Sequence, residues 1–206
     1  MELANLEDVV TLGFDVRERI GERSAGAWSE ERRSRFLIRP EVRYPLSVDR
    51  SVWPQASGRR NEEAPLYVWG SVAEILVAFP GVLSKRPTSP IVIEIAVLAT
   101  GHSAQRWRDL FQGVLRPERD SALEVGFQEY GYDVADRSLL SGLSNCMLSS
   151  EELESLRTTW KGSVNSLGLF SEVGEAAKYS GVCDSLIPEH APFSAYRIRR
   201  VAVRAP

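Results

Sequence analysis

The segment at residues 91–99, IVIEIAVLA, places the strongest constraint on how this chain can fold. It is β-branched and almost entirely apolar, and Pro87, Pro90 and Gly101 flank it, which is the pattern of a strand. Apolar residues on both faces predict a central strand, because both faces then have to be covered. Glu94 interrupts the run. We expect this carboxylate to pair with an arginine, because burying an unpaired charge costs much free energy.

Other segments have the composition or spacing of strands. Alternating apolar and polar side chains predict strands at residues 10–16 and 123–128. For residues 10–16 a helix is the competing interpretation, but Gly13 disfavours a helix. In the last segment, residues 193–203, the apolar side chains change from one face of the strand to the other half-way along. A β-bulge near Arg199 and Arg200 would keep both halves on the same face. Gly131 also suggests a bulge. In chain order, these predicted strands cover residues 10–16, 65–69, 123–128 and 193–203.

Capping boxes and apolar periodicity mark the helices. A serine followed three residues later by glutamate predicts helix starts at Ser71 and at Ser149. A third helix, capped by Ser103, should place one apolar stripe against the sheet, and a fourth at about residues 172–179 should end at Gly181. The stripe consists of Trp107, Leu110, Phe111, Val114 and Leu115.

These elements predict an α+β fold in which a mixed or antiparallel central sheet packs against helices. With 206 residues, the chain is long enough for a single domain, 1–206, with a sizeable core. An irregular segment rich in arginine and proline interrupts it at about residues 21–63.

Composition excludes several classes of protein. Cys146 and Cys183 are too few for a disulfide framework or a structural zinc site, so we expect no metal and no cofactor. No secretory signal is visible at the N-terminus, and the longest apolar run is too short to cross a bilayer. We therefore expect a cytoplasmic protein that does not bind membranes.

Charge is unevenly distributed along the chain. Residues 32–60 contain eight arginines and two acidic residues, whereas residues 118–154 contain nine acidic residues and two arginines. The arginine-rich segment lacks the interleaved aromatic residues of a base-stacking surface, and the chain has a pI of about 5.6. We therefore expect no nucleic-acid binding. Such a bipolar chain can steer a charged partner.

Few residues have the types needed for catalysis. Cys146 with His102 or His190 and Asp133 would supply a cysteine nucleophile site, although a small buried thiol is the simpler interpretation. Asp133 and Asp136, three residues apart, could perform acid–base chemistry, but a solvated acidic loop is the commoner arrangement. His190, between two prolines, is typical of a solvated turn. We therefore expect no catalytic or metal site.

The segment GYDVADRSLLSGLSNC, from Gly131 to Cys146, resembles a segment of small bacterial immunity proteins from polymorphic-toxin and contact-dependent growth inhibition systems. The resemblance extends over about a third of the chain. It implies a non-enzymatic cytoplasmic protein that binds a cognate toxin and blocks the toxin's active site. It implies no residue-level site.

The acidic middle of the chain supplies the candidate binding residues. Glu124, Glu129, Asp133 and Asp136 lie on or just beyond one predicted strand, and an exposed acidic edge there would complement the basic cleft of a nuclease toxin. Two alternatives remain open: a small cytosolic enzyme that uses Cys146 or the Asp133/Asp136 pair, and a structural or adaptor subunit.

Overall fold

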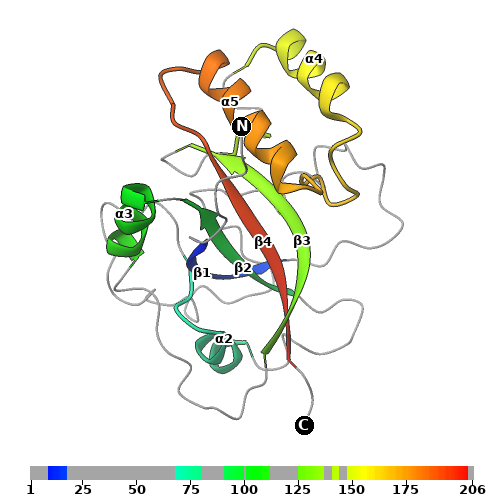
Figure 1. The fold of residues 1–206 in the computed structure, drawn as a ribbon. Helices are drawn as coiled ribbons and strands as arrows, with labels where there is room; N and C mark the ends of the chain where they lie inside the picture. The colour runs from blue at the N-terminus through cyan, green and yellow to red at the C-terminus, as the bar shows by residue number, and fades with distance from the viewer. Residues whose placement is uncertain are drawn as a thin grey trace.

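The computed structural model describes residues 9–17, 68–79, 91–99, 101–111, 125–136, 141–143 and 148–203. Over these residues the chain has an α+β fold, in which a four-stranded antiparallel sheet packs against helices (Figure 1). The irregular segment predicted at residues 21–63 lies outside the described residues. The elements in chain order are β1 (Val9–Arg17), α2 (Val72–Ala78), β2 (Ile91–Leu98), α3 (Gly101–Phe111), β3 (Val125–Ala135), α4 (Ser150–Trp160), α5 (Val173–Leu186) and β4 (Ser194–Val203).

β2 is a central strand, as its sequence predicts. The strand order is β1-β2-β4-β3, and every neighbouring pair is antiparallel, which is one of the two arrangements that the sequence left open. β2 hydrogen-bonds to β1 along one edge and to β4 along the other. All of its side chains except that of Leu98 are buried, because a hydrophobic cluster lies on each face of the sheet.

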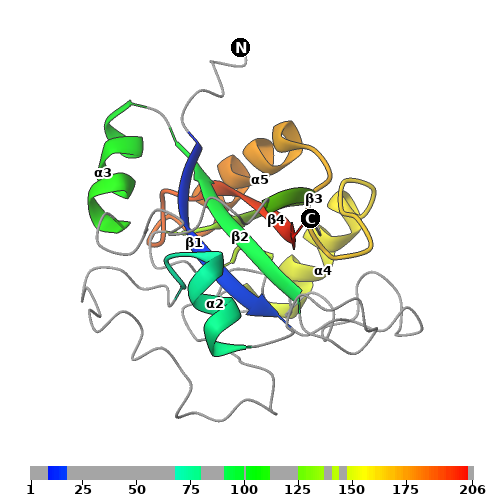
Figure 2. The same ribbon diagram turned by 90° about the horizontal axis from the view of Figure 1, so that it is seen from below.

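Two hydrophobic clusters cover the opposite faces of the sheet. The large cluster joins Ile93 and Ile95 of β2 to Trp107 of α3 and Tyr179 of α5. The small cluster joins Val92 on the other face to α2 and the neighbouring strands. Figure 1 shows α2 far from α4 and α5, and Figure 2, seen from below, shows α2 beside β1 and β2 and away from α5. Residues that alternate along β2 therefore enter different clusters, which is why the strand is apolar on both faces.

β3 is longer than predicted and includes residues that the sequence assigned to a polar turn. It extends to Ala135, because β4 pairs with it along its whole length and Ala135 is opposite Ser194. The prediction that the strand ends near Gln128 is therefore wrong. Backbone pairing with β4 outweighs the polar character of this segment, and Asp133 becomes a strand residue.

The prediction of a β-bulge on β4 near Arg199 and Arg200 is wrong: the described sheet has register irregularities on β3 and, between Thr11 and Gly13, on β1. The register of β3 with β4 shifts between Glu129 and Gly131, so Tyr130 is the extra residue, and the bulge suggested by Gly131 is confirmed. β4 needs no bulge, because a hydrophobic cluster lies on each face of the sheet, and Ile198 enters the large cluster whereas Val201 enters the small one.

The starts of α2 and α4 are confirmed. The Ser71 side chain accepts a hydrogen bond from Glu74 N at 3.2 Å and caps α2. Ser149 caps α4 within a complete capping box: its side chain accepts from Glu152 N at 3.3 Å, and its own N–H donates to Glu152 Oε2 at 2.9 Å. Both caps satisfy backbone groups that a helix end otherwise leaves unpaired.

Two helix boundaries differ from the prediction. α3 begins at Gly101, before Ser103, and Gly101 has a φ of +52°, which glycine adopts without strain. α5 continues past Gly181 to Leu186, because Cys183 on its next turn is buried in the large cluster. Of the predicted α3 stripe, Trp107, Leu110 and Phe111 pack in the large cluster, and the last two residues lie outside the described part.

The capping box predicts the cost of losing the Ser149 side chain. Ser149→Ala should lower the free energy of unfolding by about 1 kcal/mol, because two backbone N–H groups lose or weaken their partners. Thr158→Ala on the exposed face of α4 is the control, and it should not lower stability, since alanine is the better helix former. Urea unfolding of both variants measures the difference. Equal values would contradict the importance of the cap.

Two glycines predict opposite effects of the same substitution. Gly131 has a φ of +132°, and an added Cβ would lie 2.5 Å from Phe170 O, so Gly131→Ala should cost about 2 kcal/mol or more. Gly181 lies inside α5 with open space beside it, so Gly181→Ala should stabilise the protein by up to about 1 kcal/mol. Thermal unfolding checks both, and a stable Gly131→Ala variant would be inconsistent with the bulge.

Candidate functional site

Glu94 is buried in a charged cluster on the face of the sheet that carries the small cluster. It is 3% exposed, and Arg199 Nε on β4 donates to Glu94 Oε2 at 2.5 Å. Thr11 Oγ1 on β1 donates to Glu94 Oε1 at 3.0 Å, and Arg197 lies farther away, with Nη2 at 3.9 Å. The predicted pairing of Glu94 with an arginine is confirmed, and it joins three strands.

Glu129 is the predicted binding residue that the structure places at the surface. It lies opposite Arg199 in the register of β3 and β4, and Arg199 also stacks over the ring of Phe127 at 4.0 Å. Partial burial raises the pKa of Glu129, and the charges of Arg197 and Arg199 act against this rise. Glu129 is therefore part of a mixed charged surface and not of a purely acidic edge. Glu124 lies outside the described residues.

Asp133 is fully buried, so its predicted place on an exposed acidic edge is wrong. Asp133 Oδ1 accepts hydrogen bonds from Ser141 Oγ and from Val134 N, both at 2.7 Å. The register of β3 and β4 places Asp133 opposite the buried Tyr196, which explains why the carboxylate points inward. Its hydrogen bond to Ser141 secures the turn that follows β3.

Asp136 is also buried, at 2% exposure, and the prediction of an exposed carboxylate is wrong here too. His190 Nδ1 lies 2.8 Å from Asp136 Oδ2, although 54 residues separate them. The His190 side chain is 34% exposed, so the expected solvated turn is partly confirmed, but the imidazole is held by a carboxylate. Asp184 Oδ1 fixes the same turn by accepting from Phe193 N at 2.7 Å.

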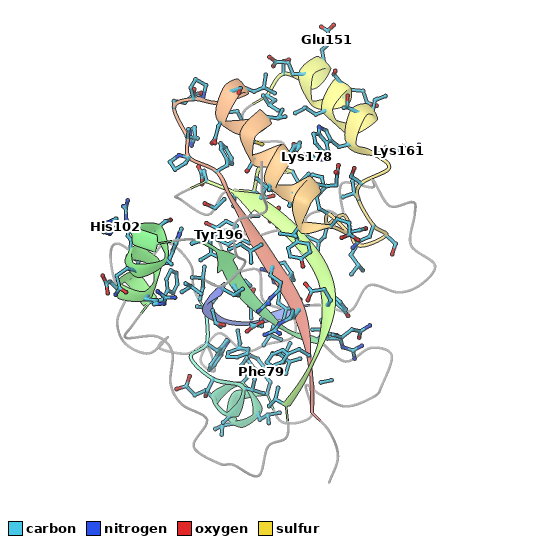
Figure 3. All side chains as sticks on the ribbon, viewed as in Figure 1. Phe79, His102, Glu151, Lys161, Lys178 and Tyr196 are labelled. Carbon is cyan, nitrogen blue, oxygen red and sulfur yellow. The ribbon has the colours of Figure 1, made fainter. Side chains whose placement is uncertain are left out.

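A cavity of about 940 Å³ lies between α3 and the beginning of β4, beside Asp136. His102, Arg106 and Trp107 line it from α3, and Ser194 and Tyr196 line it from β4. Figure 3 shows His102 on α3 and Tyr196 between α3 and β4. The volume is that of a small-molecule site or of a surface recess for a partner's loop.

Tyr196 has a buried hydroxyl group that finds no hydrogen-bond partner in this structure. Burial raises the pKa of Tyr196 far above its ordinary value, and the charges of Asp133 and Asp136 raise it further. The phenol therefore stays protonated near neutral pH. The indole of Trp107 packs edge-on against its ring, with centroids 6.1 Å apart. A buried polar atom without a partner costs free energy, and such atoms are found at functional sites.

Cys183 is a packed thiol whose burial disfavours the thiolate form. It is buried in the large cluster, and burial raises its pKa to about 12, although its hydrogen bond with Tyr179 acts in the opposite direction. Cys146 lies outside the described residues, so the structure leaves that candidate untested. Within the described part of the chain, no three His, Cys, Asp or Glu residues are grouped so that they could hold a metal ion.

Among the described helices, none is long and apolar enough to cross a membrane. Comparison of the chain with protein-family models, curated proteins and solved structures yields no match. The site therefore has to be interpreted from its own geometry.

The sequence interpretation missed the contact between Asp136 and His190 and the cavity beside them. One signal was present: His190 lies in the turn Pro188-Glu189-His190-Ala191-Pro192, where prolines restrict the backbone and can hold an imidazole in one direction. Nothing local indicated its partner, because the antiparallel pairing of β3 with β4 alone brings these distant residues together.

The raised pKa of Cys183 predicts a thiol that does not react in the folded protein. In a Cys146→Ser variant, iodoacetamide at pH 8 should leave Cys183 unmodified for hours and should label it rapidly in urea, because a pKa of about 12 leaves little thiolate. Mass spectrometry measures the labelling. Rapid labelling of the folded variant would show that Cys183 is accessible and ionisable.

Proposed function

We propose that this chain is a cytoplasmic immunity protein that binds a cognate bacterial toxin and neutralises it without catalysis. One observation carries the proposal. The segment that resembles immunity proteins begins at Gly131, and one of its described residues lies in the wall of a surface cavity that a partner could enter. Asp136 from this segment lines the cavity, and Asp133 anchors the turn behind it.

The docking surface that we propose differs from the acidic edge expected from the sequence. Buried carboxylates at positions 133 and 136 cannot make an exposed edge, whereas the cavity between α3 and β4 is open to a partner. The exposed side chains of Ser103, Gln105 and Arg106 form its α3 wall. A recess with polar walls and an aromatic interior has the anatomy of a protein-binding site.

Two of the residues offered for catalysis, Asp133 and Asp136, have structural partners, which supports binding over chemistry. Asp133 accepts hydrogen bonds from Ser141 and from the backbone, and Asp136 contacts His190. These partners favour a structural role for the Asp133/Asp136 pair over joint acid–base chemistry on one substrate. Asp133 secures a turn, and Asp136 holds a histidine.

A small enzyme is the second candidate, and the contact between Asp136 and His190 favours it. A buried carboxylate that accepts from Nδ1 orients an imidazole so that its other nitrogen can exchange a proton with a substrate. The neighbouring cavity could admit such a substrate. Stoichiometry separates the two candidates, because a binding protein neutralises an equal amount of toxin, whereas an enzyme acts when present in much smaller amounts.

The proposal predicts protection that depends on the cavity. The toxin to test is the product of a large secreted-toxin gene directly upstream of this chain's gene, and co-expression should restore growth at a molar ratio of about one. Ser103→Trp, which fills the cavity from α3, should weaken binding to that toxin at least about tenfold, because the recess has to be empty to admit the partner.

Ser155→Trp on the exposed surface of α4 is the matched control and should bind as the unaltered chain does. Calorimetry of the purified pair measures affinity and stoichiometry together. Failure of the unaltered chain to bind or protect would refute the proposed function. Full binding by Ser103→Trp would show that the toxin docks on another surface of the chain. Neutralisation of the toxin by much less than an equimolar amount of the chain would favour the enzyme.

A further inference from the structure

The outer edge of β3 is divided into two halves. β3 lies at the edge of the sheet, with β4 on one side of it (Figure 1). In its second half the chain itself satisfies the outer backbone groups, because Tyr132 and Phe170 exchange two hydrogen bonds, of 2.9 and 2.8 Å. At the bulge between the halves, Asn165 Nδ2 donates to Tyr130 O at 2.7 Å. The first half, residues 125–129, has no such cover from the described residues.

The register of the sheet shows which backbone groups of the first half point outward. In an antiparallel pair, the residues that bond across the pair alternate with residues that face away from it. Tyr132 faces away from β4, so its neighbour Asp133 bonds to Tyr196 of β4. The bulge lies on β3, so the alternation along β4 is unbroken, and every second residue after Tyr196 also bonds to β3. Two of these residues lie opposite Gln128 and Gly126, which therefore face β4.

Val125, Phe127 and Glu129 alternate with those residues, so their backbone N–H and C=O groups point to the outer edge. No described residue forms a hydrogen bond with these groups on that side. Phe127 is 43% exposed and Glu129 is exposed as well, so solvent reaches this half of the edge. Proteins often protect such an edge with proline, lysine or a bulge, because another strand can pair with it. Residues 125–129 contain no proline or lysine, and the bulge follows them.

The side chains along this edge add specificity to the backbone groups. Those of Val125, Phe127 and Glu129 lie on one face of the sheet, where Val125 packs against the small cluster. Arg199 stacks over the Phe127 ring at 4.0 Å, which holds the ring in place while part of it stays exposed. Glu129 forms no ion pair with a described residue, although the charges of Arg197 and Arg199 partly balance its own. On an added strand, the residue directly opposite would contact each of these side chains.

We propose that residues 125–129 bind an extended segment of a partner protein as a fifth, antiparallel strand, with an apolar side chain opposite Phe127 and a basic one opposite Glu129. Only an extended backbone presents N–H and C=O groups at the spacing of the three outward positions. The antiparallel direction matches every pair in the described sheet and gives the more stable pairing. From its N-terminus, the partner segment therefore has a basic residue, then an apolar residue two positions later, then a second apolar residue opposite Val125.

A second copy of this chain is a poorer occupant of the same edge. If two copies paired through residues 125–129 about a two-fold axis at Phe127, each Glu129 would lie opposite Val125 of the other copy. The carboxylate would then face an apolar side chain, whereas a basic residue opposite it forms a favourable cross-strand pair. The charge of Glu129 therefore favours a different protein with a basic residue at that position.

Amide hydrogen exchange of the full chain, measured by NMR, tests whether the edge is open. The Phe127 amide should exchange at least about tenfold faster than the Gln128 amide, because only Gln128 bonds to β4. Slow exchange of Phe127 at every protein concentration would show that another part of the chain covers the edge. Slow exchange that appears only at high protein concentration would show that a second copy does. Either result would overturn the inference.

The probe is the peptide acetyl-TRTVTVT-amide, whose arginine and two valines match the three outward positions. It should bind with millimolar affinity and slow the exchange of the Phe127 amide severalfold at saturation. Two matched controls carry one N-methyl group each. Methylation at position four, whose N–H faces β3, should abolish binding, whereas methylation at position five, whose N–H faces away, should not. Equal binding by the two methylated peptides, or no binding by the unmodified one, would overturn the inference.

A reversal of charge tests the position of the basic residue. A probe with glutamate in place of arginine should bind the unaltered chain severalfold more weakly, and Glu129→Lys should reverse this preference. Glu151→Lys on α4 makes the same charge change far from β3 (Figure 3) and should leave the preference as it is. An unchanged preference in the Glu129→Lys variant would contradict the proposed register.

Two further variants separate this inference from the proposed function, on which it does not depend. Phe127→Thr keeps a β-branched strand residue but removes the exposed ring, and it should weaken probe binding severalfold. Ser103→Trp fills the cavity beside α3 and should bind the probe as the unaltered chain does. Full binding by Phe127→Thr, or loss of binding in Ser103→Trp, would overturn the inference. If the toxin does not bind but the probe does, the proposed function falls and the strand-binding edge stands.

Discussion

The pairing of β4 with both of its neighbours is the interaction on which the rest of the structure depends. β4 hydrogen-bonds to β2 on one side and to β3 on the other, and without it the sheet would divide into two parts. The same pairing places Arg199 beside Glu94 and Tyr196 beside Asp133. The large cluster, the charged cluster and the cavity therefore all depend on one register.

Three buried polar residues lie together at the end of the sheet where β3 finishes and β4 begins. Asp133, Asp136 and Ser141 are almost completely buried there, and hydrogen bonds connect them to a turn on each side. Buried polar groups are costly unless satisfied, so satisfied ones fix a single arrangement of the backbone. This rigidity explains how the turn after β3 and the turn before β4 can hold the wall of the cavity in place.

The sequence predicted those features that depend on local patterns. The apolar run of β2 revealed a central strand, and the serine–glutamate spacing revealed the start of α4, because each signal lies within a few residues. The need of Glu94 for a cation was predictable from its burial, but the identity of Arg199 was not, because 105 residues separate them. The site was predicted less well. A carboxylate on a strand has the same local sequence whether it faces water or a core, and only the register with β4 decides that Asp133 faces inward.

The central position of β4 has a consequence for how the chain folds as it is made. β2 remains without one neighbour until β4, about a hundred residues later, leaves the ribosome, which takes on the order of ten seconds during synthesis. During that interval an apolar strand exposes an open edge, which is the kind of surface that chaperones bind and that aggregation begins from. Contacts between residues so distant in sequence also slow the search for the native sheet. The delay before the sheet can close is therefore a second constraint on producing this protein, beside the stability of the closed sheet.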